Sequence, residues 1–389
     1  MTNRELMTDE NLRYIERARE VAEKYVRPVA AHYDREQTYP WEILERLKEA
    51  KLTGVWIPKE FGGEGGGVLN LCLVIEELSK ACGGVGVAYA VNALGSFPLI
   101  VAGTEEQKRK FLPDVATGNR LVAFGLSEME AGSDAASMKT SAVRQGDHYI
   151  LNGAKKWNTC GAVARLQTAF CVTNPERGAR GISAFLVEDG TPGYVKGKAE
   201  DKMGIRCVPV IEIEFHDCRV PAENLLGGKE GFGFRHAMMT LDRARPGVAA
   251  QAVGLAQGAL DLAVKYTTER KQFGQTLSAF QGIQWMLADM ATKIEAARQL
   301  VHAAARVCDS GSKDITKISA MCKLFASDVA MEVTTNAVQL FGGYGYVKDY
   351  PIEKYMRDAK ITQIYEGTNQ IQRLVIARSM LREAASVTE

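Results

Sequence analysis

No proline occurs between Pro246 and Pro351, so helices inside this interval can run long and unbroken. A proline within a helix removes a backbone hydrogen bond and clashes with the preceding turn. Apolar residues in the interval recur at spacings of three and four, which places them on one face of a helix. The three stripes are Val253, Ala256, Leu260 and Val264; Ile283, Met286, Leu287, Met290, Ile294 and Ala297; and Ile318, Met321, Phe325 and Val329. We therefore expect a C-terminal four-helix bundle over residues 231–389.

The pattern changes to that of strands between residues 121 and 230. Short β-like runs occupy 149–151, 168–172, 182–187 and 210–215, and Asn152-Gly153 is a typical hairpin signal. In the last run, apolar residues alternate with Glu212 and Glu214, as expected of a strand with one covered face. These features predict a middle β-barrel-like domain over 121–230.

Helical periodicity returns at the start of the chain. Apolar residues recur at helical spacing over 9–26, where Pro28 should end the helix, and again over 69–80. We expect an N-terminal helical domain over 1–120. The whole chain is then an α+β protein in the order helical, β, helical.

Charge and cysteine content exclude several classes of protein. With 48 Lys and Arg against 47 Asp and Glu, there is no basic surplus for a nucleic-acid partner. The eight cysteines contain no C-x-x-C pair and are typical of reduced, buried thiols. The first ten residues lack an apolar signal region, and no stretch approaches the roughly 18 uninterrupted apolar residues of a membrane span. We expect a cytoplasmic protein, or a processed matrix form, without a membrane partner.

Common catalytic motifs are absent from the sequence. The five histidines form no H-x-x-x-H pair, His216-x-Cys218 stands alone at ligand-like spacing, and no metal site is expected. No G-x-S-x-G offers a nucleophilic serine, and the glycine-rich run 61–67 lacks the Lys-Ser/Thr of a phosphate loop. Metal-dependent and serine hydrolysis are both disfavoured.

Two segments remain as candidates for chemistry. In 124–134, the backbone around Gly132 and the Ser133 hydroxyl could hold a pyrophosphate, or could form a capped loop between domains. In 365–370, Glu366 stands before a glycine and could be a catalytic base or a solvated helix end. The residues alone leave both alternatives open.

Five motifs in order resemble the acyl-CoA dehydrogenase family. They are Ala131-Gly132-Ser133-Asp134, Trp157-x-Thr159, Glu269-Arg270-Lys271-Gln272-Phe273-Gly274, Gln339-x-x-Gly342-Gly343-x-Gly345 and Tyr365-Glu366-Gly367-Thr368, preceded by the turn at 57–63. The resemblance covers nearly the whole chain. It implies FAD as cofactor, an acyl-CoA substrate and an electron-transferring flavoprotein as acceptor. It also implies a homo-oligomer of at least two subunits; a dimer of dimers, hence a homotetramer, is expected, but the choice between dimer and tetramer stays open.

The resemblance also implies a role for individual residues in the FAD site. Phe124, Leu126 and Ser127 would line the isoalloxazine ring. Gly132 and Ser133 would lie near the phosphate side of the flavin and the CoA entrance. Trp157 and Thr159 would contact the flavin. Thr368 and Gln370 would complete this site. Arg270, Phe273, Gln281, Gln339 and Gly343 would reach the FAD of a neighbouring subunit.

Glu366 then becomes the candidate base for removal of the acyl-CoA α-proton. Some family members carry the acid after Leu241, but the matching position here is Ala244, which cannot act as a base. By the same resemblance, the substrate site would contain Val87, Ala90, Val91, Ser133, Arg245, Tyr365 and Gly367.

The acyl group should be uncharged, because 87–92 carries no basic residue to pair with a distal carboxylate. Asn158 and Cys160 depart from the usual family pattern; they could tune the flavin, widen the site for a branched or cyclic acyl group, or be neutral. Chain length stays open. The alternatives are a dehydrogenase of a cyclic or aromatic acyl-CoA, and a flavin-dependent acyl-CoA oxidase.

Overall fold

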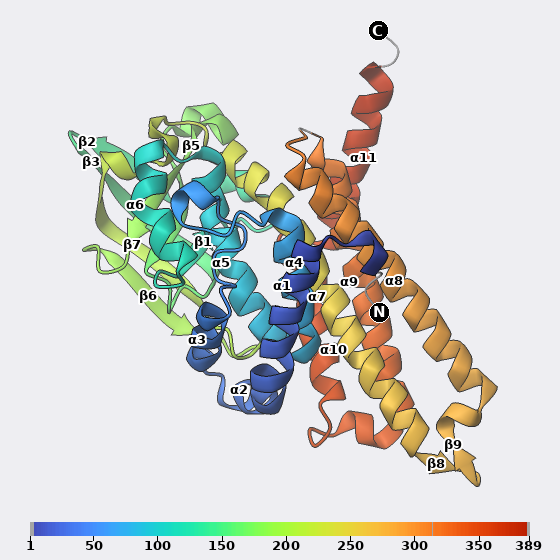
Figure 1. Cartoon of the computed structure of the whole chain (residues 1–389). Coiled ribbons are helices and arrows are strands. Elements are labelled where there is room, and N and C mark those ends of the chain that lie inside the picture. The colour runs from blue at the N-terminus through green and yellow to red at the C-terminus, as the bar shows by residue number, and fades with distance from the viewer. Residues whose placement is uncertain (1–3, 313, 387–389) are drawn as a thin grey trace.

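The computed structural model describes residues 4–312 and 314–386. Figure 1 shows a sheet on one side, a set of long helices on the other, and the first helices of the chain between them. The N-terminal helices are α1 (Asp9–Val21), α2 (Ala30–Glu36), α3 (Trp41–Glu49), α4 (Gly67–Ala81), α5 (Gly83–Ala102) and α6 (Glu105–Ala116). The predicted order of helical, β and helical parts is confirmed.

The first helix begins where its sequence provides a cap. Thr8 Oγ1 accepts from the backbone N–H of Asn11 at 3.2 Å, and the Asn11 side chain accepts from Thr8 N at 3.1 Å. The prediction that the helix ends at Pro28 is wrong, because π and 3₁₀ turns carry the chain on from Val21 into α2. Pro28 lies in the first turn of a 3₁₀ segment, where its missing N–H leaves no hydrogen bond unmade.

The middle of the chain forms one curled sheet. Its strands are β1 (Val122–Gly125), β2 (Ser141–Gln145), β3 (His148–Thr159), β4 (Leu166–Val172), β5 (Ile182–Glu188), β6 (Tyr194–Ala199) and β7 (Val210–Pro221). The order is β1-β4-β2-β3-β7-β6, with β5 also paired to β4. The predicted alternation along β7 is confirmed, since Ile211, Ile213 and Phe215 are buried while Glu212 is partly exposed.

The hairpin predicted at Asn152-Gly153 is wrong. Both residues lie inside β3, at a register shift opposite β7, and the turn between β2 and β3 falls at 146–147. A Cβ on Gly153 would stand 2.8 Å from the Thr140 Cα, so the glycine allows a close backbone approach at a bulge.

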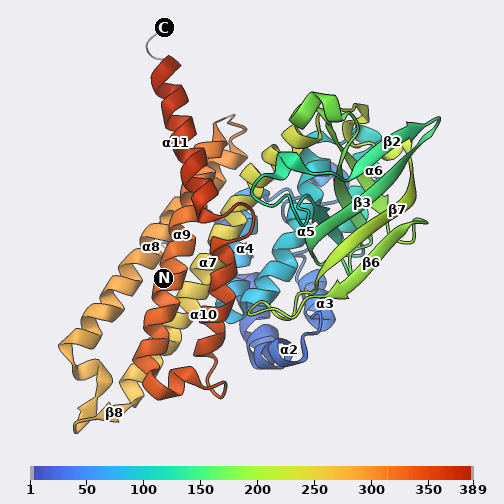
Figure 2. The ribbon, with the colours of Figure 1, turned by 180° about the vertical axis from the view of Figure 1, so that it is seen from behind.

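The C-terminal part is a helical bundle with a small hairpin at one end (Figures 1 and 2). Its elements are α7 (Gly233–Glu269), β8 (Lys271–Gln272), β9 (Gln275–Thr276), α8 (Gln281–Asp309), α9 (Ile315–Phe341), α10 (Ile352–Lys360) and α11 (Asn369–Ser386). The bundle predicted from the proline-free interval is confirmed. Figure 2 shows α11 extending beyond the other helices at the end opposite the hairpin.

The third predicted stripe does not mark the buried face of α9. Phe325 is 40% exposed, whereas Ser319, Lys323 and Ser327 are fully buried. Small side chains such as those of Ala326 and Ala330 let the neighbouring helices approach α9 closely, and of the predicted stripe only Val329 is buried among the described residues. The buried face of α9 therefore combines small apolar residues and Val329 with the polar Ser319, Lys323 and Ser327.

By length and composition alone, α5 and α7 could cross a membrane. Their most apolar windows are 72% and 78% buried within the protein. The expectation that no stretch approaches such a composition was therefore too strong, and burial in the core accounts for the apolarity of both helices.

Candidate active site

Glu366 lies in the segment between α10 and α11, in a backbone conformation that is rare for a glutamate. Its φ is +53°, and Gly367 follows with φ +90°. The Gln372 side-chain amide donates to the carbonyl of Glu366 at 3.2 Å and to that of Gly367 at 2.8 Å. A left-handed non-glycine residue costs about 1–3 kcal/mol and persists where the surroundings impose it, often at functional sites.

The Glu366 carboxylate borders an apolar cavity between α4, α5 and α7. The cavity is lined by Leu71, Ile75, Val87, Ala90, Val91, Ala93, Leu94, Phe97, Ala244, Gly247, Val248, Gln251, Tyr365 and Glu366. Glu366 is the one carboxylate among these residues, and the Ala244 methyl lies in the same lining. Val87, Ala90, Val91 and Tyr365, expected at the substrate, are thus brought together beside the candidate base.

The environment of Glu366 suits it to proton abstraction. Its Oε2 is buried and has no hydrogen-bond partner among the described residues. Burial raises the pKa of Glu366 to about 7, although the positive charges of Arg245 and Lys323 oppose this shift. A carboxylate with a pKa near the working pH is an effective general base.

Gln251 is a polar residue of this cavity that belongs to none of the sequence motifs. Its side-chain oxygen accepts a hydrogen bond from the Tyr365 hydroxyl, and its amide donates to the Gly83 carbonyl at 3.4 Å. Gln251 is 1% exposed. It therefore links α7 to the start of α5 and to the segment that carries Glu366.

Arg245 is buried next to the cavity and is held by an acid on its own helix. Its Nη1 donates to Asp242 Oδ1 at 2.7 Å, and the Thr316 hydroxyl donates to the other oxygen of Asp242 at 2.6 Å. Its Nε–H is buried without a partner in the described part of the chain. The guanidinium interacts electrostatically with Glu366 and keeps one donor unused. Contact with substrate stays a prediction.

A second surface, on the sheet, presents an exposed aromatic ring. Trp157 is 59% exposed and has φ +60°, at the register shift between β3 and β7. The backbone N–H of Lys156 donates to the Ser127 carbonyl at 2.9 Å, and the Asn158 amide donates to the Phe124 carbonyl at 3.2 Å. These bonds bring Trp157 beside the segment 124–127 predicted to line the flavin.

This surface fits a flat ring with hydrogen-bonding edges. An indole held exposed by a strained backbone offers a face for stacking. Asn158 is fully buried, and its Oδ1 has no hydrogen-bond partner in the described residues. Thr159 is half-buried, Leu126 is buried, and Gly132 and Ser133 are exposed, with open space where a Cβ on Gly132 would lie.

A buried ion pair supports the loop after β1. Lys155 is fully buried, and its Nζ lies 2.7 Å from Glu128 Oε1. The Glu128 carboxylate also accepts from the backbone N–H of Lys139 at 2.7 Å and of Thr140 at 3.0 Å. The pair therefore fixes both ends of the loop that contains Gly132. The alternating pattern of β3 gives no sign of this burial.

The remaining predicted FAD residues lie at two other places. Arg270, Gln339 and Gly343 line a wide, open hollow at the hairpin end of the bundle, and its lining includes neither Trp157 nor Glu366. Phe273 is 94% exposed with φ +51°, and Gln281 is exposed at the start of α8. Thr368 accepts from Ile371 N at 3.3 Å at the start of α11, and Gln370 is exposed.

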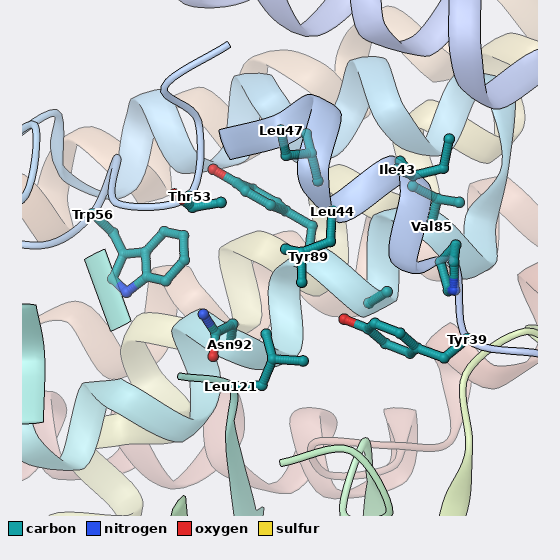
Figure 3. Close-up of a pocket in the computed structure, with 12 residues that line it drawn as sticks. Tyr39, Ile43, Leu44, Leu47, Thr53, Trp56, Val85, Tyr89, Asn92 and Leu121 are labelled. Carbon is teal, nitrogen blue, oxygen red and sulfur yellow. The ribbon is translucent and has the colours of Figure 1, made fainter. Parts of the chain in front are cut away.

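A further small cavity lies on another face of α5, against α3 (Figure 3). Its volume is about 360 Å³. The Tyr89 hydroxyl in its lining donates to the Leu52 carbonyl at 2.7 Å, and Asn92 accepts from Val122 N at 2.8 Å. These bonds hold α5, and hence the wall of the Glu366 cavity, in place.

Sequence models of one family match almost the whole chain. The N-terminal, middle and C-terminal domains of acyl-CoA dehydrogenase match residues 8–119, 123–218 and 231–381. The chain belongs to the acyl-CoA dehydrogenase family. The resemblance seen in the motifs is therefore confirmed, and the protein is an oxidoreductase of a family whose cofactor is FAD.

Relatives of this acyl-CoA dehydrogenase are similar over nearly their full length. The probable acyl-CoA dehydrogenase FadE25 of Mycobacterium tuberculosis is 51% identical, covering 94% of this chain and 93% of its own. The short-chain specific acyl-CoA dehydrogenase of Clostridium acetobutylicum is 48% identical, with 94% and 96% covered. The acryloyl-CoA reductase (NADH) of Anaerotignum propionicum is 50% identical, with 94% and 93% covered.

Solved structures show the same fold. The butyryl-CoA dehydrogenase of Megasphaera elsdenii superposes with a TM-score of 0.94 at 46% identity, covering 96% of this chain and 99% of its own. A chain from work on the electron-transferring flavoprotein of Acidaminococcus fermentans also gives a TM-score of 0.94, at 51% identity, with 97% and 99% covered.

Proposed function

We propose that this acyl-CoA dehydrogenase oxidises a short, uncharged acyl-CoA to its 2-enoyl-CoA, with Glu366 as the base that takes the α-proton. One observation carries this proposal: the Glu366 carboxylate, whose Oε2 is buried without a partner among the described residues, borders an apolar cavity. An acyl chain in that cavity would bring its α-carbon beside Glu366 Oε2. This oxygen accepts no hydrogen bond from any other group of the described chain.

The lining of the cavity supports an uncharged acyl group. It contains no Lys, Arg or His among the described residues, so a distal carboxylate would be buried without a partner. Relatives described as short-chain specific, and the butyryl-CoA dehydrogenase, point to a short chain. The Tyr365–Gln251 hydrogen bond across the lining limits the space for a longer one.

Three parts of the site would act together in the reaction. The apolar walls exclude water, which strengthens the attraction between Glu366 and the α-proton. The strained turn at 366–367 leaves the Glu366 backbone N–H to hold the thioester oxygen as negative charge develops there. Bound FAD supplies the acceptor for the β-hydride. Phe124, Leu126, Ser127, Gly132, Ser133, Trp157, Thr159, Thr368 and Gln370 would hold it.

We also propose a homo-oligomer, with an electron-transferring flavoprotein as acceptor. Arg270, Gln339 and Gly343 line the hollow at the hairpin end of the bundle, and Phe273 and Gln281 are exposed at the same end. A second chain that placed its flavin in this hollow would use them all.

The test is anaerobic bleaching of the FAD-loaded protein with straight, branched, cyclic and dicarboxylic acyl-CoAs. We expect butyryl-CoA to reduce the flavin fastest and glutaryl-CoA to leave it oxidised. Rapid reduction only by cyclic or aromatic acyl-CoAs would replace the substrate class proposed here. The acryloyl-CoA reductase among the relatives adds one arm, in which NADH and acryloyl-CoA are mixed with the protein to test the reverse direction.

A further inference from the structure

Lys323 is a buried lysine of α9 whose side chain ends at the Glu366 turn. It is 0% exposed, and its Nζ donates to the Gly367 carbonyl at 2.9 Å and to the Asn369 side-chain oxygen at 2.9 Å. Within residues 4–312 and 314–386, no carboxylate oxygen lies within 4.0 Å of this Nζ. A buried ammonium without a direct ion pair is costly, so its position calls for a physical reason.

The charged groups around Lys323 come from three elements. Glu366 faces it from the segment before α11, Arg245 from α7, and Asp328 from its own helix. Burial lowers the pKa of Lys323 to about 7, whereas the charges of Glu366 and Asp328 oppose this shift. Asp328 accepts from the Asn369 amide at 2.7 Å and from Arg373 at 3.0 Å, so it is already engaged. The unpartnered oxygen among these acids belongs to Glu366.

We propose that Lys323 is a positioning residue for proton abstraction: its ammonium holds the Gly367 carbonyl, and with it the Glu366 turn, and supplies a positive charge that favours ionised Glu366. The inference rests on the proposed function of Glu366 as the base. Lys323 belongs to α9, which carries none of the cavity-lining residues, and it contacts the Glu366 turn from the side away from the cavity.

The hydrogen bonds explain how the turn is held. The Gly367 carbonyl accepts from Lys323 and, at 2.8 Å, from Gln372. Two donors from different helices fix the orientation of that carbonyl, and the left-handed Glu366 backbone depends on it. Asn369 completes the link, because its amide donates to Ser327 at 2.8 Å on α9.

The charge explains how much of the base is ionised. Without a nearby cation, a carboxyl buried in an apolar cavity stays protonated at neutral pH and cannot accept a proton. A cation in direct contact would lower its pKa so far that it became a weak base. The Lys323 ammonium, present below its own pKa of about 7 and bound to neutral oxygens, favours ionisation without that contact and adds to the attraction of Arg245. The arrangement keeps the pKa of Glu366 near the working pH.

The experiment removes the charge in FAD-loaded protein with Lys323→Met, and with Lys323→Gln as a second variant that retains an amide donor. The rate of flavin reduction by butyryl-CoA is measured by anaerobic stopped flow across pH. We expect the midpoint of the pH profile to move to higher pH by about one unit, because an attraction that favours the carboxylate is lost. At pH 7 the rate should fall by roughly fivefold, because the ionised fraction of a base drops by about that factor when its pKa rises from about 7 to about 8. Lys323→Arg keeps the positive charge, so the midpoint of its pH profile should lie close to that of the wild type.

A readout that needs no turnover accompanies the kinetics. Infrared titration of the resting protein follows the protonated carboxyl band of Glu366, identified by its loss in Glu366→Gln. This midpoint should move upward together with the kinetic one. Ser327→Ala is the matched control, since it removes a hydrogen bond of the same cluster and no charge, and should leave both midpoints in place.

Unchanged midpoints in both Lys323→Met and Lys323→Gln would overturn the inference, even if the rates fell. Failure of the proposed function would look different: wild-type flavin would not be reduced by butyryl-CoA at any pH. The infrared midpoint would still report whether Lys323 sets the ionisation of Glu366.

Discussion

The Tyr365 hydroxyl donates a hydrogen bond to the side-chain oxygen of Gln251, so the residue next to the candidate base is tied to the middle of α7. Both side chains lie in the lining of the apolar cavity. We expect Gln251→Ala to enlarge the cavity and shift the preference toward longer acyl chains. The measurement is kcat/KM for butyryl-, hexanoyl- and octanoyl-CoA.

The size of this shift follows from the methylenes that the enlarged cavity can bury. Each is worth about 0.8 kcal/mol, so the ratio of octanoyl to butyryl activity should rise by more than tenfold. A ratio that stays at the wild-type value would place the limit on chain length elsewhere.

Glu366→Gln should keep the fold and the bound FAD but lower the rate of flavin reduction by at least about a thousandfold, because an amide cannot take the α-proton. The wild-type rate should rise as pH increases through about 7, where the base ionises. Near-normal turnover of the variant would exclude Glu366 as the base.

Glu366→Gln should raise the stability of the folded protein, although it lowers the activity. The folded-state pKa of Glu366 is raised, so the folded protein keeps a proton that the unfolded chain has lost between roughly pH 4.5 and 7. Stability therefore falls across that window in the wild type, and Glu366→Gln removes the penalty. At pH 8 we expect the variant to be more stable by up to about 3 kcal/mol, and at pH 4 to match the wild type. Thermal melts at the two pH values measure this difference.

Lys155→Met should destabilise the protein by about 3–5 kcal/mol, because it leaves the Glu128 carboxylate largely buried without its ion-pair partner. The loop that contains Gly132 loses its anchor, so FAD should also dissociate more easily. The double variant Lys155→Met, Glu128→Gln should recover part of the stability, since no unpaired charge is left. Urea unfolding and FAD retention on gel filtration give the two readouts. Equal losses in the single and double variants would argue against the ion pair as the cause.

Helix positions and family membership could be predicted from the sequence, because apolar periodicity and ordered motifs are local properties. The buried face of α9 could not: Lys323 and Ser327 are polar, and only the packing of the surrounding helices shows that they point inward. Asn152-Gly153 has the residues of a turn, but pairing with β7 keeps both in a long strand. Glu366 was found by its motif, whereas its strained backbone and the Tyr365–Gln251 bond depend on contacts between distant segments.

Assembly should depend on FAD if the residues at the hairpin end reach a cofactor in another subunit. Phe273 is 94% exposed in the single chain, far more than an aromatic side chain usually is. We expect Phe273→Ser, and Arg270→Ala, to weaken both the oligomer and FAD binding, and added FAD to shift the variants back toward the oligomer by mass action. Sedimentation velocity with and without FAD measures this. A wild-type protein that is FAD-replete and monomeric would contradict the proposed assembly.

Reduced flavin must pass its electrons onward, and the access of O₂ to the site decides whether an acyl-CoA dehydrogenase or an oxidase results. The cavity beside Glu366 is apolar and packed between three helices, so bound product would fill it and exclude water from the reacting face. We expect rapid reduction by a short acyl-CoA, slow reoxidation of the product-bound protein in air, and fast reoxidation by an electron-transferring flavoprotein or an artificial dye. Stopped-flow absorbance with a peroxide assay measures both rates. Reoxidation by air as fast as turnover, with one peroxide formed per product, would establish an oxidase instead, because only direct transfer to O₂ gives that stoichiometry.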